Sequence, residues 1–285
     1  MSTVTLTSIG GSVTMYGENQ RADGVYQVGA QFFSDWYTVS DSKTEIRERP
    51  AGDGAFGIDR DWRSSLMLNM AGRFRGAGWA SMLMALRSIL IVGVPVTITV
   101  VDDFGETTRV VSVRRFVPTP NPGAQLVEFQ LVVLATDPLM YGPIRSASTT
   151  PPTSGTGQPW PQVWPVDWGT PGMDGRATAE NGGSAPSPLV LAVTGGADGV
   201  ELVEILSGRI LRLERVIPVG STVVFDVSLS VAYLDLPEND ITGFMTRREW
   251  DGFQIPAFGS RIVQFNPLGT VIGTPLLTLS WSDAN

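Results

Sequence analysis

The chain has 285 residues, of which 42% are hydrophobic and 17% charged, a balance typical of folded protein with room for two domains of ordinary size. Its formal net charge of −8 argues against binding nucleic acid through the phosphates, which requires clustered lysine and arginine. It contains no cysteine and no histidine, which excludes disulfides, thiolate metal sites, the common zinc sites, and Ser-His-Asp or Cys-His catalysis.

The residues after Met1 lack the basic-then-apolar pattern of a signal peptide. The most apolar run, residues 89–96, is too short to span a bilayer. We therefore expect synthesis in the cytoplasm and no membrane insertion.

Alternation of apolar and polar residues predicts three strands in the first 70 residues. They cover residues 3–9, 26–33 and 62–70. In the second strand, one face is expected to hold Tyr26, Val28, Ala30 and Phe32, and in the third to hold Trp62, Leu66, Leu68 and Met70.

One strong helical period lies between Gly78 and Val92. Its apolar residues, at spacings of three and four, are Trp79, Met82, Leu83, Leu86 and Leu90. The polar side of this helix is thin, with Ser81 and Arg87. The stripe is expected to pack on the core, with contact to a neighbouring subunit as the second interpretation.

Further strands are predicted over 94–101, 107–117 and 126–135, so the first block is β-rich with one packed helix. The strand 107–117 is locally basic through Arg109, Arg114 and Arg115. These arginines could contact DNA in a lumen or form ion pairs between subunits. Because Asp102, Asp103 and Glu106 lie beside them in sequence, ion pairing is favoured.

From residue 141 to 188 the chain is rich in Pro, Gly, Ser and Thr and has no period, which predicts a connection between domains. We divide the chain into 1–142, the connection 143–187, and 188–285. The connection carries Trp160, Trp164 and Trp168 between prolines. In order of preference, these rings form a clasp between domains, a subunit contact, or a platform that stacks on sugars.

Residues 181–229 read as four short strands with turns at Ser207–Gly208 and 218–220, which predicts antiparallel β structure. In the last of these strands, one face is expected to hold Val223, Phe225, Val227 and Leu229, and the other Thr222, Val224, Asp226 and Ser228.

Three carboxylate pairs could in principle serve glycoside cleavage or bind calcium. They are Asp59 with Asp61, Asp102 with Asp103, and Glu238 with Asp240. Their positions in turns favour capping instead. We therefore expect no catalytic, cofactor-binding or metal-binding residues, no cofactor, and no enzymatic activity.

The order of features from Asn181 onward resembles the C-terminal β-sandwich of siphophage distal tail proteins. These features are an Asn-Gly start, a strand ending in Thr-Gly-Gly, a Ser-Gly turn, and Val-Gly-Ser-Thr leading into a strand that carries Asp226. The first block resembles the same family through ERPAGDGAFGIDRDWRSSLMLNMAGRF, the helix, VPVTITVVDDFGETTRVVSVRRF, and a strand ending in Asp137–Pro138. The Trp- and Pro-rich connection is longer than the family pattern.

The resemblance implies a mainly β fold: an N-terminal tail-tube-like β-sandwich with one flanking α-helix, and a C-terminal galectin-like antiparallel β-sandwich. It also implies a virion protein that forms a homo-hexameric ring joining the tail tube to the tip of a long non-contractile tail. The implied partners are the tail tube protein and a tail-tip hub or tail-associated protein, with DNA only a passing occupant of the lumen. The candidate assembly or docking residues are Arg87, Arg109, Arg114, Arg115, Trp160, Trp164 and Trp168.

The alternative is a carbohydrate- or receptor-binding accessory module of the tail tip, with a cell-surface glycan as partner. Its mark would be an exposed aromatic pair beside Asn, Arg or Asp on one strand face. A glycosidase, with two carboxylates in a cleft, is the third candidate.

Overall fold

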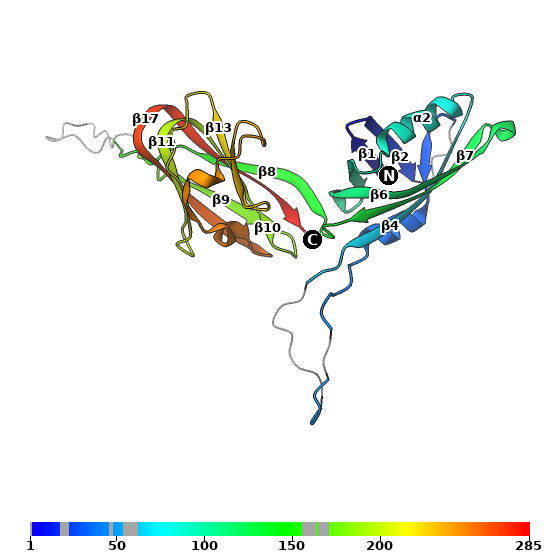
Figure 1. Cartoon of the computed structure of the whole chain (residues 1–285), viewed down its shortest axis with the longest axis horizontal. Coiled ribbons are helices and arrows are strands. Elements are labelled where there is room, and N and C mark those ends of the chain that lie inside the picture. The colour runs from blue at the N-terminus through cyan, green and yellow to red at the C-terminus, as the bar shows by residue number, and fades with distance from the viewer. Residues whose placement is uncertain (1, 18–22, 46–47, 54–61, 156–163, 165–170) are drawn as a thin grey trace. The chain divides into compact units, whose positions relative to one another are not determined.

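The computed structural model describes residues 2–17, 23–45, 48–53, 62–155, 164 and 171–285 (Figure 1). Contacts within the chain divide it into two compact units, Met1–Gly142 and Pro143–Asn285. Each unit is described by itself.

Among the described residues of unit 1, seven strands pair in a closed cycle. They are β1 (Thr3–Ser8), β2 (Gly11–Gly17), β3 (Tyr26–Val28), β4 (Leu66–Arg75), β5 (Pro95–Asp102), β6 (Gly105–Asn121) and β7 (Leu126–Ala135). The cyclic order is β1–β2–β3–β4–β7–β6–β5, and only the β2–β3 pair is parallel. A short 3-10 helix, η1 (Pro122–Ala124), joins β6 to β7. Alternate side chains of these strands point inward and form one hydrophobic core.

Two helices accompany this sheet, α1 (Ala30–Tyr37) and α2 (Trp79–Ile89). Helix α2 confirms the predicted helical period, with Leu86 and Ile89 buried in the core. Helix α1 corrects the strand predicted over 26–33, because β3 ends at Val28 and the chain then turns helical. Phe32 and Trp36 are both buried and lie one helical turn apart. The strand was predicted because Tyr26, Val28, Ala30 and Phe32 also fit a period of two.

The strand predicted over 62–70 begins later, at Leu66. Leu66, Leu68 and Met70 face the core as expected. Trp62 is exposed and lies outside the strand, so its assignment to the buried face was wrong.

Unit 2 is built on two long strands, β11 (Val190–Glu204) and β17 (Gly259–Ala284), which pair with each other along most of their length. The other strands are β8 (Tyr141–Thr149), β9 (Arg176–Asn181), β10 (Ser187–Pro188), β12 (Ile210–Leu213), β13 (Thr222–Asp226), β14 (Val231–Leu234), β15 (Met245–Arg248) and β16 (Gln254–Ile255). Two short 3-10 helices, η2 (Thr242–Phe244) and η3 (Trp250–Phe253), lie between them.

Register shifts near Gly195 and Asp198 divide the β11–β17 pair into two halves. One half of β11 pairs with β13, which in turn pairs with β14, and the other half pairs with β12, which pairs with β15. Strand β9 pairs with the first residues of β17, and β8 also neighbours β17. Side chains from both halves share one core.

The predicted connection 143–187 contains most of β8 and all of β9. Sequence patterning missed β9 because its inward positions are Ala177, Ala179 and Asn181, two small residues and one polar residue. Such side chains carry a weak hydrophobic signal even when buried. The prediction of a mainly β fold is confirmed.

Candidate assembly surfaces and a polar hollow

Arg109 of β6 is buried, with 3% of its surface exposed. Its guanidinium donates one hydrogen bond to the carbonyl oxygen of Trp36 and another, of 3.0 Å, to that of Pro138. It also lies over the Trp36 ring, 4.8 Å from the ring centre. Arg109 therefore links α1 to the segment after β7, which corrects its assignment to an assembly or docking surface.

Burial lowers the pKa of Arg109 to about 10, although nearby Asp137 and Tyr37 act in the opposite direction. Trp36 lies in the last turn of α1, where backbone carbonyls lack partners within the helix. A cation there also interacts favourably with the helix dipole. The guanidinium thus supplies a hydrogen-bond donor to a backbone carbonyl in the last turn of α1.

Arg114 and Arg115 lie further along β6 and are exposed. The β6–β7 register shifts between Val113 and Arg115, so Arg114 is the extra residue of a β-bulge. After the bulge the alternation changes sign, and Phe116 packs against the core. The bulge therefore leaves the adjacent Arg114 and Arg115 both exposed to solvent, whereas Arg109 of the same strand points inward.

Helix α2 exposes Arg87 and Met84, and 63% of the Met84 surface is accessible. At its C-terminal end, Ile91 and Val92 are exposed as well, as is Ile9 in the β1–β2 turn. The Ser8 hydroxyl donates a 3.0 Å hydrogen bond to the Ile89 carbonyl, which fixes this turn against the helix end. An apolar strip with one arginine thus borders α2 on the surface of unit 1.

The outer face of β2, β1, β5 and β6 carries many hydroxyl groups, and we call it the hydroxyl face. It consists of Thr3, Thr5, Thr7, Ser12, Thr14, Thr97, Thr99, Thr108 and Ser112, with Tyr16, Val101 and Val110 among them. Cross-strand contacts join Thr5 to Thr14 (3.1 Å) and Thr7 to Ser12 (3.2 Å). These outward positions are uncharged, in a chain with 28 acidic and 20 basic residues. Glu106 of β6, directly opposite Val101, adds one carboxylate to the same face.

Trp160 and Trp168 lie outside the described residues. Trp164 is described, and 84% of its surface is exposed to solvent. The predicted docking of these three rings stays a prediction.

Two of the carboxylate pairs can be followed in the structure. Asp102 accepts hydrogen bonds from the backbone N–H of Phe104 (2.9 Å) and from the Tyr37 hydroxyl (2.5 Å). Asp240 accepts from the backbone N–H of Thr242 (2.7 Å), and hydrogen bonds from Thr242 lower the pKa of Asp240. Both are turn caps, as the sequence predicts.

The pair Asp59 and Asp61 lies outside the described residues. Across the described part of the chain, no group of three or more acidic side chains is arranged to hold a metal ion.

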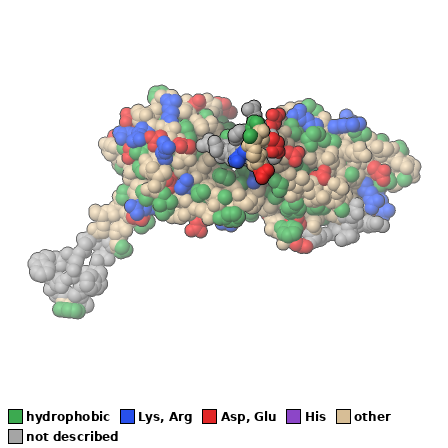
Figure 2. Space-filling model, turned by 90° about the horizontal axis from the view of Figure 1, so that it is seen from below, with side chains coloured by type: hydrophobic (Ala, Val, Ile, Leu, Met, Phe, Trp, Pro, Cys, Tyr) green, Lys and Arg blue, Asp and Glu red, His purple; other side chains and the backbone are tan. Residues whose placement is uncertain are grey.

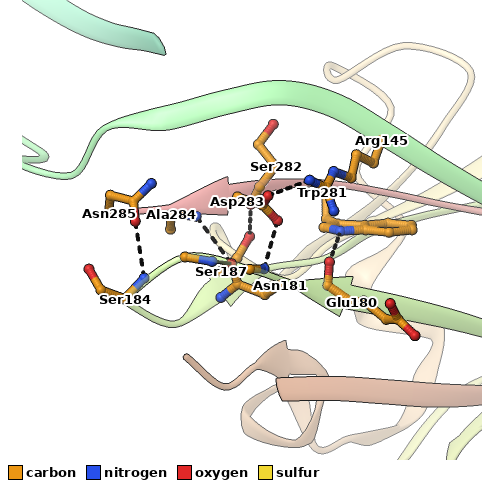
Figure 3. Close-up of polar contacts among 12 residues, drawn as sticks. Arg145, Glu180, Asn181, Ser184, Ser187, Trp281, Ser282, Asp283, Ala284 and Asn285 are labelled. Atoms are coloured by element: carbon orange, nitrogen blue, oxygen red, sulfur yellow. Dashed lines mark hydrogen bonds and ion pairs between the residues drawn. The ribbon is translucent and has the colours of Figure 1, made fainter. Parts of the chain in front are cut away.

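In unit 2, Asn181 ties the end of the last strand to β9 (Figure 3). Its side-chain nitrogen donates to the carbonyls of Ala185 (2.7 Å) and Pro256 (3.3 Å), and its oxygen accepts from the N–H groups of Gly183 (2.9 Å) and Ala284 (3.3 Å). The amide nitrogen of this buried side chain thus donates two hydrogen bonds, and its oxygen accepts two. We call these four hydrogen bonds of Asn181 the Asn181 lock, because they hold β9 to the end of β17. The Asn-Gly sequence alone does not indicate this structural role.

Only glycine fits at position 183, because the backbone of Ala284 lies too close for a side chain. A Cβ on Gly183 would lie 2.0 Å from the carbonyl oxygen of Ala284, which excludes any larger residue without a backbone shift. Close by, the Trp281 indole donates a 2.7 Å hydrogen bond to the Glu180 carbonyl. The Asp283 carboxylate accepts from the Gly182 N–H (2.9 Å) and pairs with Arg145 (2.6 Å).

Beside the Asn181 contacts lies an open hollow of about 470 Å³ on unit 2, which we call the polar hollow because four of its seven lining residues are polar or charged. It is lined by Arg145, Glu180, Asn181, Gly182, Phe258, Gly259 and Ser260. Phe258 is 76% exposed and has a backbone φ of 50°, the left-handed region that favours glycine. Sequence analysis missed this group because its members come from three separate segments.

The visible molecular face carries acidic and basic side chains interspersed rather than one continuous basic field (Figure 2). This pattern fits the net charge of −8 and gives nucleic-acid phosphates no extended basic surface on that face. Neither helix in the described portion has the length and apolar content needed to traverse a bilayer.

The fold of this chain, a closed β unit with two helices followed by a second β unit, is similar over nearly its whole length to those of two solved phage proteins. No protein-family model matches the chain, and no curated protein sequence matches it. The similarity to known proteins is therefore found by comparing folds and not by comparing sequences.

The chain is similar to the Dit protein of phage SPP1, whose structure is described as a paradigm of the hub adsorption apparatus of phages that infect Gram-positive bacteria. The two share 13% sequence identity, the match covers 99% of each chain, and the TM-score is 0.60. A chain of the phage P2 baseplate is also similar, with 8% identity, 98% of each chain covered and a TM-score of 0.51. The predicted resemblance to distal tail proteins is confirmed at the level of the fold.

Proposed function

We propose that this protein is a structural component of the tip of a long phage tail. The observation that carries the proposal is the whole-chain match in fold to SPP1 Dit and to a P2 baseplate chain. Both units and their order along the chain are included, which a chance likeness of one β domain would not give.

In this proposal the protein joins the tail tube to the tail tip as a ring, which the family resemblance makes a hexamer. Residues 1–142 form a tail-tube-like, ring-closing sandwich, and residues 188–285 form a galectin-like sandwich that faces outward, with 143–187 between them. Each copy uses one face to meet a different face of the next copy, and such contacts close into a ring when the rotation divides a full turn. The partners are further copies of this chain, the tail tube protein and a tail-tip hub or tail-associated protein.

Two surfaces of unit 1 suit such a ring. The apolar strip beside α2, with Met84, Ile91 and Val92 exposed next to Arg87, offers a contact surface between copies. The exposed Arg114 and Arg115 can pair with acidic groups of a neighbouring copy.

The hydroxyl face suits the lumen. DNA carries about one negative charge per 1.7 Å of helix axis, so a basic lining would hold it and slow its passage. A surface of threonine and serine with Glu106 as a carboxylate, and no lysine or arginine among its positions, offers DNA phosphates neither ion pairs nor a large apolar patch. We assign this face to the lumen, where DNA is a passing occupant.

The role is structural rather than enzymatic. The Asp102 and Asp240 carboxylates are engaged in turn capping, and the absence of histidine removes the most common general base. The assembled protein would reside in the virion after synthesis in the host cytoplasm.

The mass of the purified protein tests the ring. Native mass spectrometry at rising concentration, with and without the tail tube protein, is expected to show a six-copy species. A monomer under all these conditions would exclude the ring, whereas a closed ring with a different copy number would correct only the number of subunits.

The lack of native cysteine allows a clean test of the lumen assignment. Thr99→Cys in the assembled ring is expected to react with N-ethylmaleimide and to be shielded from a bulky polymer-linked maleimide. Leu229→Cys, at an exposed turn of unit 2, is the control and should react with both reagents. Equal reaction of the two variants with the bulky reagent would remove the hydroxyl face from the lumen.

A further inference from the structure

Phe258 occupies a position that neither backbone preference nor burial explains. Its φ of 50° lies in the left-handed region, which glycine and asparagine adopt far more readily than an aromatic residue. The turn is fixed on both sides, because the Phe258 N–H donates to the Gly183 carbonyl (3.0 Å) and the Gly259 N–H donates to Pro256 (3.2 Å). Because 76% of the surface of Phe258 is exposed, its side chain contributes little hydrophobic stabilisation to the fold.

A strained residue with an exposed ring indicates selection for something other than stability. Phe258 is one of the residues that line the polar hollow, which is open to solvent and has a volume of about 470 Å³. Two other lining residues, Glu180 of β9 and Ser260 of β17, are directly opposite each other in the strand register. Gly182, which follows β9, also lines the hollow.

The charges of the hollow decide which ligand it favours. The Arg145 guanidinium is already paired with Asp283 at 2.6 Å. The lining also includes Glu180, whose carboxylate points away from this pair (Figure 3) and adds a second negative charge to the hollow. Two carboxylates against one guanidinium disfavour an anionic ligand. The same groups can serve a neutral ligand, because hydroxyls donate to carboxylates and accept from the remaining N–H groups of an arginine, which has five.

We propose that this hollow binds a neutral sugar in the pyranose form. The C–H face of the sugar lies against the Phe258 ring, and its hydroxyls bond to Glu180, Ser260 and Arg145. The lock around Asn181 keeps these groups in place, because it holds together the ends of β9 and β17. The assignment goes beyond the structural role proposed above and does not depend on ring formation.

Calorimetric titration of the full-length protein tests the site. The neutral probes are maltose, cellobiose, lactose and N,N′-diacetylchitobiose, and the anionic probes are digalacturonate and glycerol 3-phosphate. At least one neutral probe is expected to bind, and the anionic probes are not. Failure of all four neutral probes, or tighter binding of an anionic one, would overturn the proposal.

Substitutions then assign the binding to the hollow. Phe258→Gly and Glu180→Gln are each expected to weaken binding by about tenfold or more, the size of a lost contact to a charged or stacked group. Phe258→Trp should retain binding. Phe244→Ala removes another exposed aromatic ring of unit 2 and should leave binding unchanged.

Thermal melting of Phe258→Gly separates this site from a purely structural role. Because glycine tolerates the left-handed backbone, the variant is expected to melt at or above the temperature of the natural protein while losing sugar binding. A clearly lowered melting temperature, or unchanged binding in this variant, would contradict the proposal.

Discussion

The guanidinium of Arg109 donates a hydrogen bond to the backbone carbonyl of Trp36 and lies over the indole ring of the same residue. This contact joins the middle of β6 to the last turn of α1, 73 residues apart in the chain. The Trp36 indole in turn donates a 3.0 Å hydrogen bond to Thr107, also on β6. Helix α1 is thereby fixed to the sheet by polar contacts as well as by its apolar face.

Replacing Arg109 is expected to destabilise unit 1. Arg109→Met leaves the Trp36 and Pro138 carbonyls without their donors in a buried setting, at a cost of about 2–4 kcal/mol. Scanning calorimetry should show the transition of unit 1 at a lower temperature. Arg115→Met, at an exposed position of the same strand, should leave it nearly unchanged, and equal effects of the two would show that the buried contact is unimportant.

Unit 1 should lose stability at alkaline pH through Tyr37. Burial and the hydrogen bond to Asp102 raise the pKa of Tyr37 to about 12 from its usual value of 10.0. A pKa raised by folding means stability that is present below pH 10 and is lost as the pH rises toward 12. Denaturant unfolding between pH 8 and 11 should therefore show a smaller fall for Tyr37→Phe than for the natural protein, and parallel curves would refute this coupling.

The helix stripe can be tested with two positions on α2. Leu86 is fully buried, whereas 63% of Met84 is exposed. Leu86→Asp would bury an unpaired carboxylate at a cost of about 3 kcal/mol or more, and we expect unit 1 not to fold. Met84→Asp should fold normally, as judged by circular dichroism and melting, and a cooperatively melting Leu86→Asp protein would show that the stripe is not core.

The Asn181 lock predicts a large effect from a small substitution. Asn181→Ala removes hydrogen bonds to four backbone groups and should cost unit 2 about 2–4 kcal/mol. Asn239→Ala, at an exposed turn of the same unit, is the matched control. Hydrogen exchange should show faster exchange at Gly183 and Ala284 in the first variant, and protection equal to that of the control would disprove the lock.

The sequence alone determined those features that depend on local periodicity and composition. The mainly β fold, helix α2 and the turn-capping carboxylates could be predicted because an amphipathic stripe, a period of two and turn residues are short-range signals. The resemblance to distal tail proteins followed from the order of such signals along the chain.

Only the tertiary structure decided the features that depend on residues far apart in the sequence. Helix α1 is too short for its period to be distinguished from alternation, and β9 buries alanine and asparagine instead of large apolar residues. Arg109 reads as a surface cation, yet the fold buries it because α1 presents a carbonyl and an indole ring to it. The polar hollow gathers Arg145, Glu180 and Phe258 from three segments, and no local pattern predicts a group that forms only when β8, β9 and the turn before β17 meet.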